Sequence, residues 1–308
     1  MKDVEVHYLT KESFRSVLAA NEYIDHLYCF KDNLREVIPA LKAERYDYII
    51  DLHKNIRSAK VKKALKAQSY VFPKLNLKKW LLVNLKIDLL PKISIVDRYM
   101  EAAKPLGVKN DSLGLDYFID KAEDIRTKDI PMSHVAGYIA CVIGGSYNTK
   151  KLPVENWKRL CEAINHPIIL LGGKEDAEDG ALIAAQDSVK IYNACGKFSL
   201  NESVSLVKYA KMVLTNDTGL MHAAAAYNKN IVSFWGNTVP ELGMYPYYGN
   251  GGLGDNKSLI VENKELRCRP CSKIGYNKCP KGHFKCMRNL DMEYVSNYIN
   301  QKLKTPNL

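Results

Sequence analysis

Long apolar runs are missing from this sequence. No stretch reaches the roughly 18 consecutive apolar residues that a membrane-spanning helix needs. The opening residues, MKDVEVHYLTKESF, contain no apolar signal core, and neither a short-period repeat nor a low-complexity tract occurs among the 308 residues. These absences argue against a helical membrane protein, an exported protein and a repeat array, so we expect a globular protein in the cytoplasm.

Acidic residues are outnumbered, with 34 Asp and Glu against 45 Lys and Arg and a net charge of +11. The surplus is concentrated in residues 51–100, which contain 12 Lys and Arg but only 3 Asp and Glu. Such a segment attracts nucleic acid, anionic lipid headgroups or anionic glycolipids, unless it is only a solvated helical face. Apolar residues lie among lysines in LKKWLLVNLK (77–86), which suits either a membrane-surface contact or a core helix.

Strand-like and helix-like segments alternate along the chain, which is typical of a parallel α/β sheet. In the first part the patterns predict strands at 4–9, 46–52 and 69–72 and helices at 57–67 and 97–107. After a polar connection, they predict strands at 137–145, 167–173, 212–217 and 230–236 and helices at 154–164, 175–186, 199–210 and 219–227. We therefore expect two α/β domains with a cleft between them.

The segment TNDTGLMHAAAA (215–226) combines a strand end, a tight turn and the start of a small-residue helix. The first N–H groups of a helix are unpaired and lie at the positive end of its dipole, which suits a pyrophosphate. Gly219 lets a phosphate approach the backbone, and the Thr218 hydroxyl can add a hydrogen bond. The segment predicts a phosphate site, with a plain N-cap at Asp217 and Thr218 and a packed core His222 as the simpler alternatives.

Glycine turns follow two further predicted strands. GGS (144–146) comes after one of them, with Lys150 close behind, and LGGKE (171–175) comes after the next. Glycines at the carboxyl end of a parallel strand, with a lysine nearby, suit a ligand in the crevice of the sheet. Glu175 could hold ribose hydroxyls. Each turn taken singly is ordinary, and the argument rests on their combination.

The order of these blocks, continued by NACGKFSLNE (193–202) and SFWGNTVP (233–240), resembles the C-terminal domain of glycosyltransferase family nine, the ADP-heptose:lipopolysaccharide heptosyltransferases. In the first part DLHKNIRS (51–58) resembles the family's Asp-Leu-His-Gly-Asn-Leu-Arg-Ser motif, with Lys54 where glycine is usual. IVDRY (95–99) resembles the segment that follows this motif. The resemblance covers most of the chain.

The resemblance implies a GT-B fold, in which two Rossmann-like domains face each other across a cleft. It implies an inverting transfer of heptose or a related sugar from an ADP-sugar to the anionic lipopolysaccharide inner core, without a cofactor, by a protein peripheral to the inner membrane. We expect an acceptor-binding domain at 1–125, a nucleotide-sugar-binding domain at 134–290 and a C-terminal helix at 291–308.

Site residues are implied by the same resemblance. Those expected to bind the donor are Ser146, Lys150, Gly173, Glu175, Asp217, Thr218, Gly219, Leu220 and His222. In this assignment Lys150 stabilises the charge that develops on the departing nucleoside diphosphate. Those expected to face the acceptor are Asn55, Arg57 and Ser58.

The family's proposed catalytic base has no counterpart here. Family members usually open with a strand, a glycine-and-aspartate turn and a helix, ahead of the strand that VEVHYL (4–9) matches. That aspartate would take the acceptor proton, and no residue of this sequence corresponds to it, so we assign no base. A misassigned start, a degenerate binding-only relative and a replacement by another acidic residue are the alternatives. Without that central strand we expect exposed edges on its neighbours.

Eight cysteines fall into two groups. Four are scattered in apolar or mixed contexts and are expected to be small buried hydrophobes; they are Cys29, Cys141, Cys161 and Cys195. The other four are close together, around His283, and are a possible structural zinc site; they are Cys268, Cys271, Cys279 and Cys286. A loop closed by packing, with free thiols, is the alternative reading.

Two rival functions remain open at this level. The chain could be a family member with another donor or acceptor, or a nucleotide-sugar-binding relative without turnover. A zinc-stabilised nucleic-acid-binding protein would explain the charge and the cysteine cluster. It leaves the GGS and DTGLMH blocks unexplained, so we expect no nucleic-acid partner.

Overall fold

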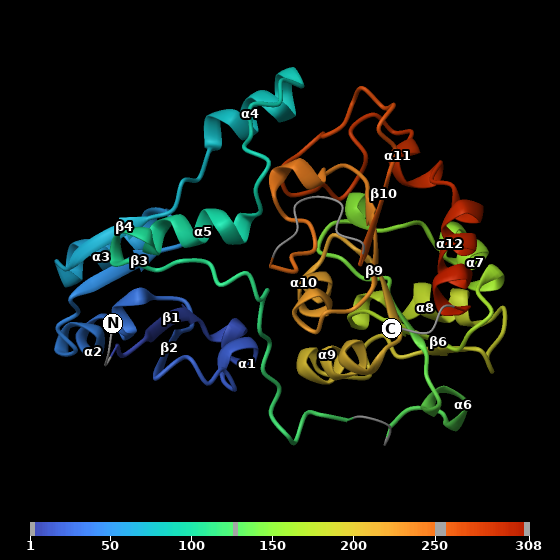
Figure 1. The fold of residues 1–308 in the computed structure, drawn as a ribbon, viewed down its shortest axis with the longest axis horizontal. Helices are drawn as coiled ribbons and strands as arrows, with labels where there is room; N and C mark the ends of the chain where they lie inside the picture. The colour runs from blue at the N-terminus through green and yellow to red at the C-terminus, as the bar shows by residue number, and fades with distance from the viewer. Residues whose placement is uncertain (1–3, 126–128, 250–256, 305–308) are drawn as a thin grey trace.

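The computed structural model describes residues 4–125, 129–249 and 257–304, and shows two α/β parts joined by a long connection (Figure 1). The C-terminal part is built on a six-stranded parallel sheet in the order β10-β9-β8-β5-β6-β7. Its strands are β5 (Ile139–Val142), β6 (Ile168–Leu171), β7 (Ile191–Asn193), β8 (Met212–Asn216), β9 (Ile231–Trp235) and β10 (Ser258–Glu262). Its helices are α7 (Val154–Ala163), α8 (Ala177–Ala184), α9 (Leu200–Tyr209), α10 (Gly219–Ala226), α11 (Lys285–Arg288) and α12 (Met292–Lys304).

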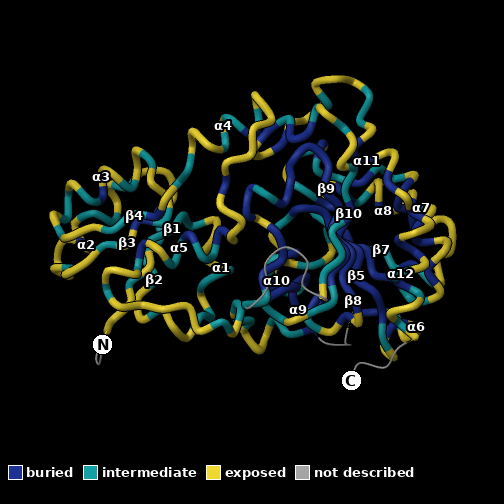
Figure 2. Tube along the Cα trace, turned by 45° about the horizontal axis from the view of Figure 1, so that its top comes forward, coloured by how far each residue is buried: buried dark blue, intermediate teal, exposed yellow. Residues whose placement is uncertain are grey.

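Both faces of this sheet are covered, because successive strand residues point to opposite sides. In β5, Ile139 and Cys141 belong to a core cluster that includes residues of α7 and α12. Ala140 and Val142 belong to a second cluster that includes residues of α9 and α10. The buried strands at the centre of the C-terminal part are visible in Figure 2. Coverage on both faces explains why these strands are almost continuously apolar.

The N-terminal part contains two separate parallel pairs, β1-β2 and β3-β4. These strands are β1 (His7–Lys11), β2 (His26–Phe30), β3 (Tyr48–Asp51) and β4 (Gln68–Val71). Its helices are α1 (Arg15–Leu18), α2 (Ile38–Ala43), α3 (Ile56–Leu65), α4 (Asn76–Leu85) and α5 (Ile95–Ala103). The short α6 (Met132–Val135) follows the connection and packs on the C-terminal sheet, where His134 Nε2 lies 3.0 Å from the carbonyl oxygen of Ile168. Short 3-10 helices lie at Glu12–Phe14, Leu34–Glu36, Lys104–Leu106, Asn148–Lys150, Lys174–Asp176 and Pro240–Leu242.

Strands β1 and β3 each have one partner within the described residues, so each keeps an unpaired edge, as expected from the sequence. Apolar side chains of these strands are also exposed. Tyr8 is 38% exposed, Tyr48 46% and Ile50 36%. Across residues 4–125, 129–249 and 257–304, no helix is both long and apolar enough to cross a membrane.

Helix α5 makes several of the contacts between the two parts. The N–H of Ile95 donates to the carbonyl of Gly243 at 2.7 Å, and the Arg98 guanidinium donates to the carbonyl of Leu242 at the same distance. The Tyr247 hydroxyl donates to the Asp97 carboxylate at 3.0 Å. Because these contacts involve the residues of the IVDRY segment, that segment fixes how the N-terminal part meets the turn after β9.

Replacing Lys54 with glycine is expected to stabilise the protein by about 1 kcal/mol, because a left-handed backbone penalises a Cβ. Lys54 has a φ of 48°, at the position where the family motif has glycine. The Lys54 N–H bond to Asp51 Oδ1, 2.7 Å long, is retained in the variant. Thermal melting measures the effect. The control, Lys60→Gly in the exposed interior of α3, should lose about 1 kcal/mol, and a Lys54→Gly protein that melts no higher than the parent would contradict the prediction.

Candidate functional site

The turns after β5, β6 and β8 lie side by side at one edge of the C-terminal sheet. The chain runs outward from β5 through β6 to β7 and then returns to β8 on the other side of β5, so the switch in strand order falls at β5 and β8. Ligands of open parallel sheets bind at this point, beyond the carboxyl ends of the strands. A Cβ on Gly145 would lie 3.7 Å from the Thr218 methyl, and one on Gly144 would lie 3.3 Å from the Gly172 Cα. The three predicted turns therefore meet.

Asp217 is the centre of a buried polar cluster in this group of turns. It is 9% exposed, and its Oδ2 accepts from the Lys150 ammonium at 2.6 Å and from the Thr238 hydroxyl at 3.0 Å. The Lys150 side chain is 16% exposed. Lys150 and Asp217 were predicted as site residues from turns far apart in the sequence, and the structure brings them into direct contact. The Lys150 ammonium therefore lies beside the start of α10.

Asn216 joins the same turns from the side of β8. Its side chain is fully buried, and its Oδ1 accepts from the N–H of Leu152 at 3.0 Å. Its Nδ2 donates to the carbonyls of Ile143 and Gly144 at 3.0 and 3.1 Å. Because one amide bonds both the end of β5 and the segment that follows Lys150, it holds the GGS turn in register with β8.

The first turn of α10 is open to a ligand. Thr218 is its N-cap, with φ −139° and ψ 172°, and makes no side-chain capping bond; its hydroxyl lies 3.3 Å from that of Thr215. A Cβ added to Gly219 would meet no atom within 4 Å. By contrast, α9 is closed by reciprocal capping-box bonds between Ser199 and Glu202. An uncapped helix start beside open space is suited to bind a diphosphate.

A second buried ion pair supports this edge, and sequence reasoning missed it. Asp176 is 1% exposed and accepts from the Lys151 ammonium at 2.6 Å and from the N–H of Gly173 at 2.9 Å. Glu175, the residue expected near the ribose, is exposed beside it. The sequence around two adjacent lysines does not indicate which carboxylate each one pairs with. Only the structure shows that Lys150 pairs with Asp217 and Lys151 with Asp176.

The remaining predicted donor residues are His222, Ser146 and Leu220, and only His222 interacts with the Lys150–Asp217 pair. His222 is half-buried on α10, and burial lowers the pKa of its imidazole, with Lys150 lowering it further and Asp217 opposing the shift. The ring is therefore neutral near pH 7. Ser146 is exposed in the turn after β5, and Leu220 packs against the core cluster beneath α9 and α10.

The predicted acceptor residues lie at the start of α3, in the N-terminal part (Figure 1). Asn55 Oδ1 accepts from the N–H of Ser58 and Ser58 Oγ accepts from the N–H of Asn55, both at 3.0 Å. These two side chains therefore cap the helix, a role that sequence reasoning did not assign to them. Arg57, between them, is exposed.

Asp51 opens the same motif and is a buried carboxylate. Burial raises the pKa of this group, but hydrogen bonds from Lys62, from the N–H groups of Lys54 and His53 and from Ser58 lower it to about 2. The Lys62 ammonium lies 2.8 Å from its Oδ2. A carboxylate that is held ionised and paired with Lys62 is a weak base, which argues against Asp51 as the replacement for the missing aspartate.

The segment that carries the cysteine cluster supports the turn after β9. Arg269 is 8% exposed, and its guanidinium donates to the carbonyls of Gly236 and Thr238 at 2.5 and 3.1 Å. It also bonds the Glu262 carboxylate at 2.9 Å. The N–H of Cys271 donates to the carbonyl of Asn237 at 2.9 Å. Because the Thr238 hydroxyl donates to Asp217, the cysteine segment indirectly holds the polar cluster around Asp217 in place.

The four clustered cysteines are free thiols in the structure. Among the described residues, no three ligand atoms of these thiols and His283 lie within 4.8 Å of one another. Cys268 Sγ lies 3.8 Å from His283 Nε2, and burial raises the pKa of Cys286 to about 11. Of the scattered cysteines, Cys29 is only half-buried and the other three are buried, as expected.

The C-terminal part is Rossmann-like, with the predicted ligand site at the switch point of its sheet, and the N-terminal part is also α/β. Two such parts are the arrangement of the GT-B fold, the fold of one class of glycosyltransferases. The structure of E. coli ADP-heptose lps heptosyltransferase II superposes with a TM-score of 0.71 at 18% identity, covering 99% of this chain and 91% of that one. An E. coli heptosyltransferase solved with ADP gives a TM-score of 0.63 at 20% identity, over 98% and 91% of the two chains.

The sequence profile of glycosyltransferase family 9 (heptosyltransferase) matches residues 34–276. Lipopolysaccharide heptosyltransferase 1 of Campylobacter coli is 26% identical over 298 residues, which cover 86% of this chain and 82% of that protein. The chain belongs to glycosyltransferase family 9. It is an enzyme of the transferase class, as the resemblance of its motifs had implied.

Proposed function

We propose that this protein transfers heptose from an ADP-sugar to the inner core of lipopolysaccharide. The observation that carries the donor side is the convergence of the Lys150–Asp217 ion pair and the uncapped start of α10 at the sheet's switch point. Relatives named for lipopolysaccharide heptosyltransfer, and a related fold solved with ADP, support the choice of donor.

The proposed reaction is a direct displacement that inverts the anomeric carbon. An acceptor hydroxyl oxygen forms the new bond to the anomeric carbon. The bond between this carbon and the phosphate oxygen breaks, and ADP leaves with the electron pair. Lys150 and the first N–H groups of α10 take up the charge on the departing diphosphate. The acceptor hydroxyl loses its proton, and no residue of this chain is assigned to receive it.

An anionic acceptor is supported by clustered cations at the junction of the two parts. Lys79, on α4, is half-buried, and its pKa is lowered to about 8 by burial and by the charges of Arg98, Lys273 and Lys74. An anion bound among these groups would offset their mutual repulsion. The pocket of about 530 Å³ next to the cysteine segment adds the cationic side chains of Lys86, Arg267 and Lys281.

Helix α4 supports work at a membrane surface. It projects from the N-terminal part (Figure 1), and it exposes Leu77 by 71%, Trp80 by 51% and Leu85 by 53% among its lysines. Apolar side chains mixed with lysines on one helix favour contact with an anionic bilayer. We therefore place the protein at the inner membrane as a peripheral protein.

Calorimetric titration with ADP, UDP and GDP tests the donor site. ADP should bind selectively, and Asp217→Ala should weaken it about 10-fold or more, because the ion pair that places Lys150 is lost. Asp47→Ala, at an exposed position outside the site, is the control. A folded sample that binds none of the three nucleotides refutes the proposal. ADP binding without transfer of heptose to a lipopolysaccharide core would identify a binding-only relative.

A further inference from the structure

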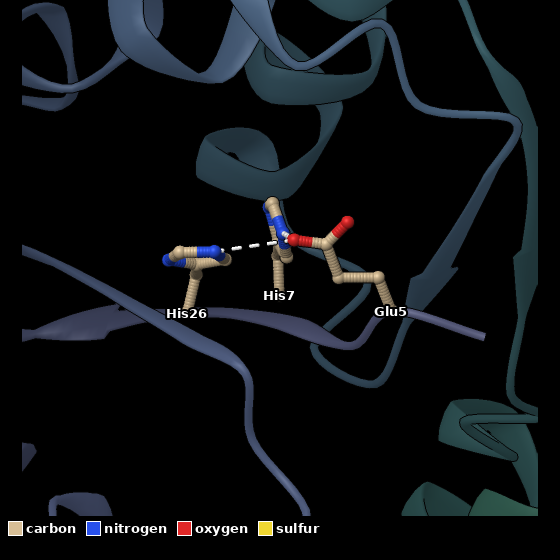
Figure 3. A group of neighbouring side chains, drawn as sticks. All are labelled: Glu5, His7 and His26. Atoms are coloured by element: carbon tan, nitrogen blue, oxygen red, sulfur yellow. Dashed lines mark hydrogen bonds and ion pairs between the residues drawn. The ribbon is translucent and has the colours of Figure 1, made fainter. Parts of the chain in front are cut away.

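Three metal-ligating side chains meet at the opposite end of the N-terminal part from the proposed chemistry. His7 and His26 are the first residues of β1 and β2 and are paired in the strand register, and Glu5 precedes β1 by two residues (Figure 3). Glu5 Oε1 lies 2.9 Å from His7 Nε2 and 3.1 Å from His26 Nε2. The three ligand atoms all lie within 4.8 Å of one another, and among the described residues they form the only such group.

We propose that Glu5, His7 and His26 bind a divalent transition-metal ion, with zinc as the natural occupant. Two imidazole nitrogens and one carboxylate oxygen form a ligand set that zinc uses in proteins, with water in the fourth position. Calcium and magnesium are disfavoured because they prefer sites made of oxygen alone.

The two distances from Glu5 Oε1 fit a zinc ion after a small adjustment. Zinc bonds of about 2.1 Å in a tetrahedron place neighbouring ligand atoms about 3.4 Å apart. The present separations from Glu5 Oε1, 2.9 and 3.1 Å, must therefore widen by only a few tenths of an ångström. The Glu5 and His26 side chains are 64% and 57% exposed and can move, whereas His7 is 7% exposed and provides the fixed ligand.

Tyr46 supplies the outer contact that such a site needs. Its hydroxyl lies 2.9 Å from Nδ1 of His7, so one ring nitrogen is engaged while Nε2 points to Glu5 and His26. A ligating histidine is normally oriented by a hydrogen bond on its second nitrogen, which fixes the tautomer and the plane of the ring. In this structure that bond comes from the residue two positions before β3.

The position of this site argues for a role apart from the transfer reaction. Its ligands are at the amino-terminal ends of β1 and β2, whereas ligands of parallel sheets bind beyond the carboxyl ends. Residues 4–6 precede the ladder and are held to the β2 side by Asp25, whose Oδ2 accepts from the N–H of Val6 at 2.6 Å. A metal ion would join this segment to β1 and β2, and through Tyr46 to the segment before β3. We expect it to stabilise a part that lacks a continuous sheet.

Cobalt titration of the whole chain, followed by visible absorption, tests the site. Co²⁺ in a four-coordinate nitrogen and oxygen site gives visible bands, whereas thiolate ligands add a charge-transfer band in the near ultraviolet. We expect visible bands without the thiolate band. Tyr46→Phe should weaken cobalt binding about 10-fold, because loss of an outer hydrogen-bond partner lowers metal affinity by about 10- to 100-fold. Substitution of any one of the three ligands should weaken cobalt binding more than about 100-fold, which exceeds that range.

The variants separate this site from the cysteine segment. Glu5→Gln, His7→Gln and His26→Gln remove one ligand each, and His283→Gln is the matched control among the cysteines. If His7→Gln fails to fold, Glu5→Gln decides the question, because its side chain is exposed. The proposal is overturned if the parent chain binds no cobalt, or if Glu5→Gln and His26→Gln bind cobalt as well as the parent. It is also overturned if the spectrum shows a thiolate band and cobalt binding is lost only in His283→Gln.

Discussion

Replacing Lys150 with glutamine is expected to lower kcat for heptose transfer about 100- to 1000-fold, the effect of losing one group that stabilises transition-state charge. The Lys150 ammonium is 2.6 Å from Asp217 and lies beside the open turn of α10. When the bond to the diphosphate breaks, this cation is the group best placed to move onto the departing oxygens. Glutamine is the informative replacement, because its amide can still donate to Asp217 while the charge is gone.

The control for Lys150→Gln is Lys158→Gln. Lys158 is on α7 and forms an exposed ion pair with Glu155 at 3.3 Å, so its loss should leave kcat within about two-fold of the parent, as for surface pairs. Initial rates and melting temperatures are measured for all three proteins. A Lys150→Gln enzyme that is folded and keeps more than a tenth of the parent kcat would contradict the role of Lys150.

A side chain at Gly219 is expected to block the donor while sparing the fold. A Cβ there meets no protein atom within 4 Å and no left-handed φ is required, so Gly219→Ala should melt at the parent temperature or slightly above. The same Cβ occupies the space above the first N–H groups of α10. Loss of one charge-assisted bond costs about 1.5–3 kcal/mol, so ADP affinity should fall about 10- to 100-fold.

Gly219→Val extends this test, and Leu200→Val is its control. Leu200 is the first residue of α9, is 47% exposed and follows the capped start at Ser199, so a branched side chain there touches no proposed ligand. Calorimetric ADP affinity should decrease from Gly219 to alanine to valine and stay unchanged for Leu200→Val. Equal ADP affinity in all the proteins would place the diphosphate away from α10.

The C-terminal part could be predicted in detail because its signals are local. The segments 137–145, 167–173, 212–217 and 230–236 were predicted as strands, and they contain β5, β6, β8 and β9. Each is a continuous apolar run that ends in glycine or a small polar turn, as expected of strands buried on both faces. The Ser199 capping box was likewise evident, since it depends on residues three apart.

Three strands were missed for a physical reason. The sequences of β2, β7 and β10 carry no strong alternation or apolar run. Their pairing is decided by neighbours that lie a helix or more away in the sequence. The predicted strand at 4–9 also began too early, because Val6 bonds the Asp25 side chain ahead of the ladder.

The sequence by itself determined most strand–turn–helix units of the C-terminal part, and it predicts that three of the turns suit a phosphate, because turn and cap chemistry depends on adjacent residues. It also determined the family, through blocks such as DTGLMH. Only the tertiary structure decided that Lys150 pairs with Asp217 and Lys151 with Asp176, and that Asn55 and Ser58 cap α3. Strand order sets which turns become neighbours, and the meeting of Glu5, His7 and His26 across two strands likewise depends on pairing register.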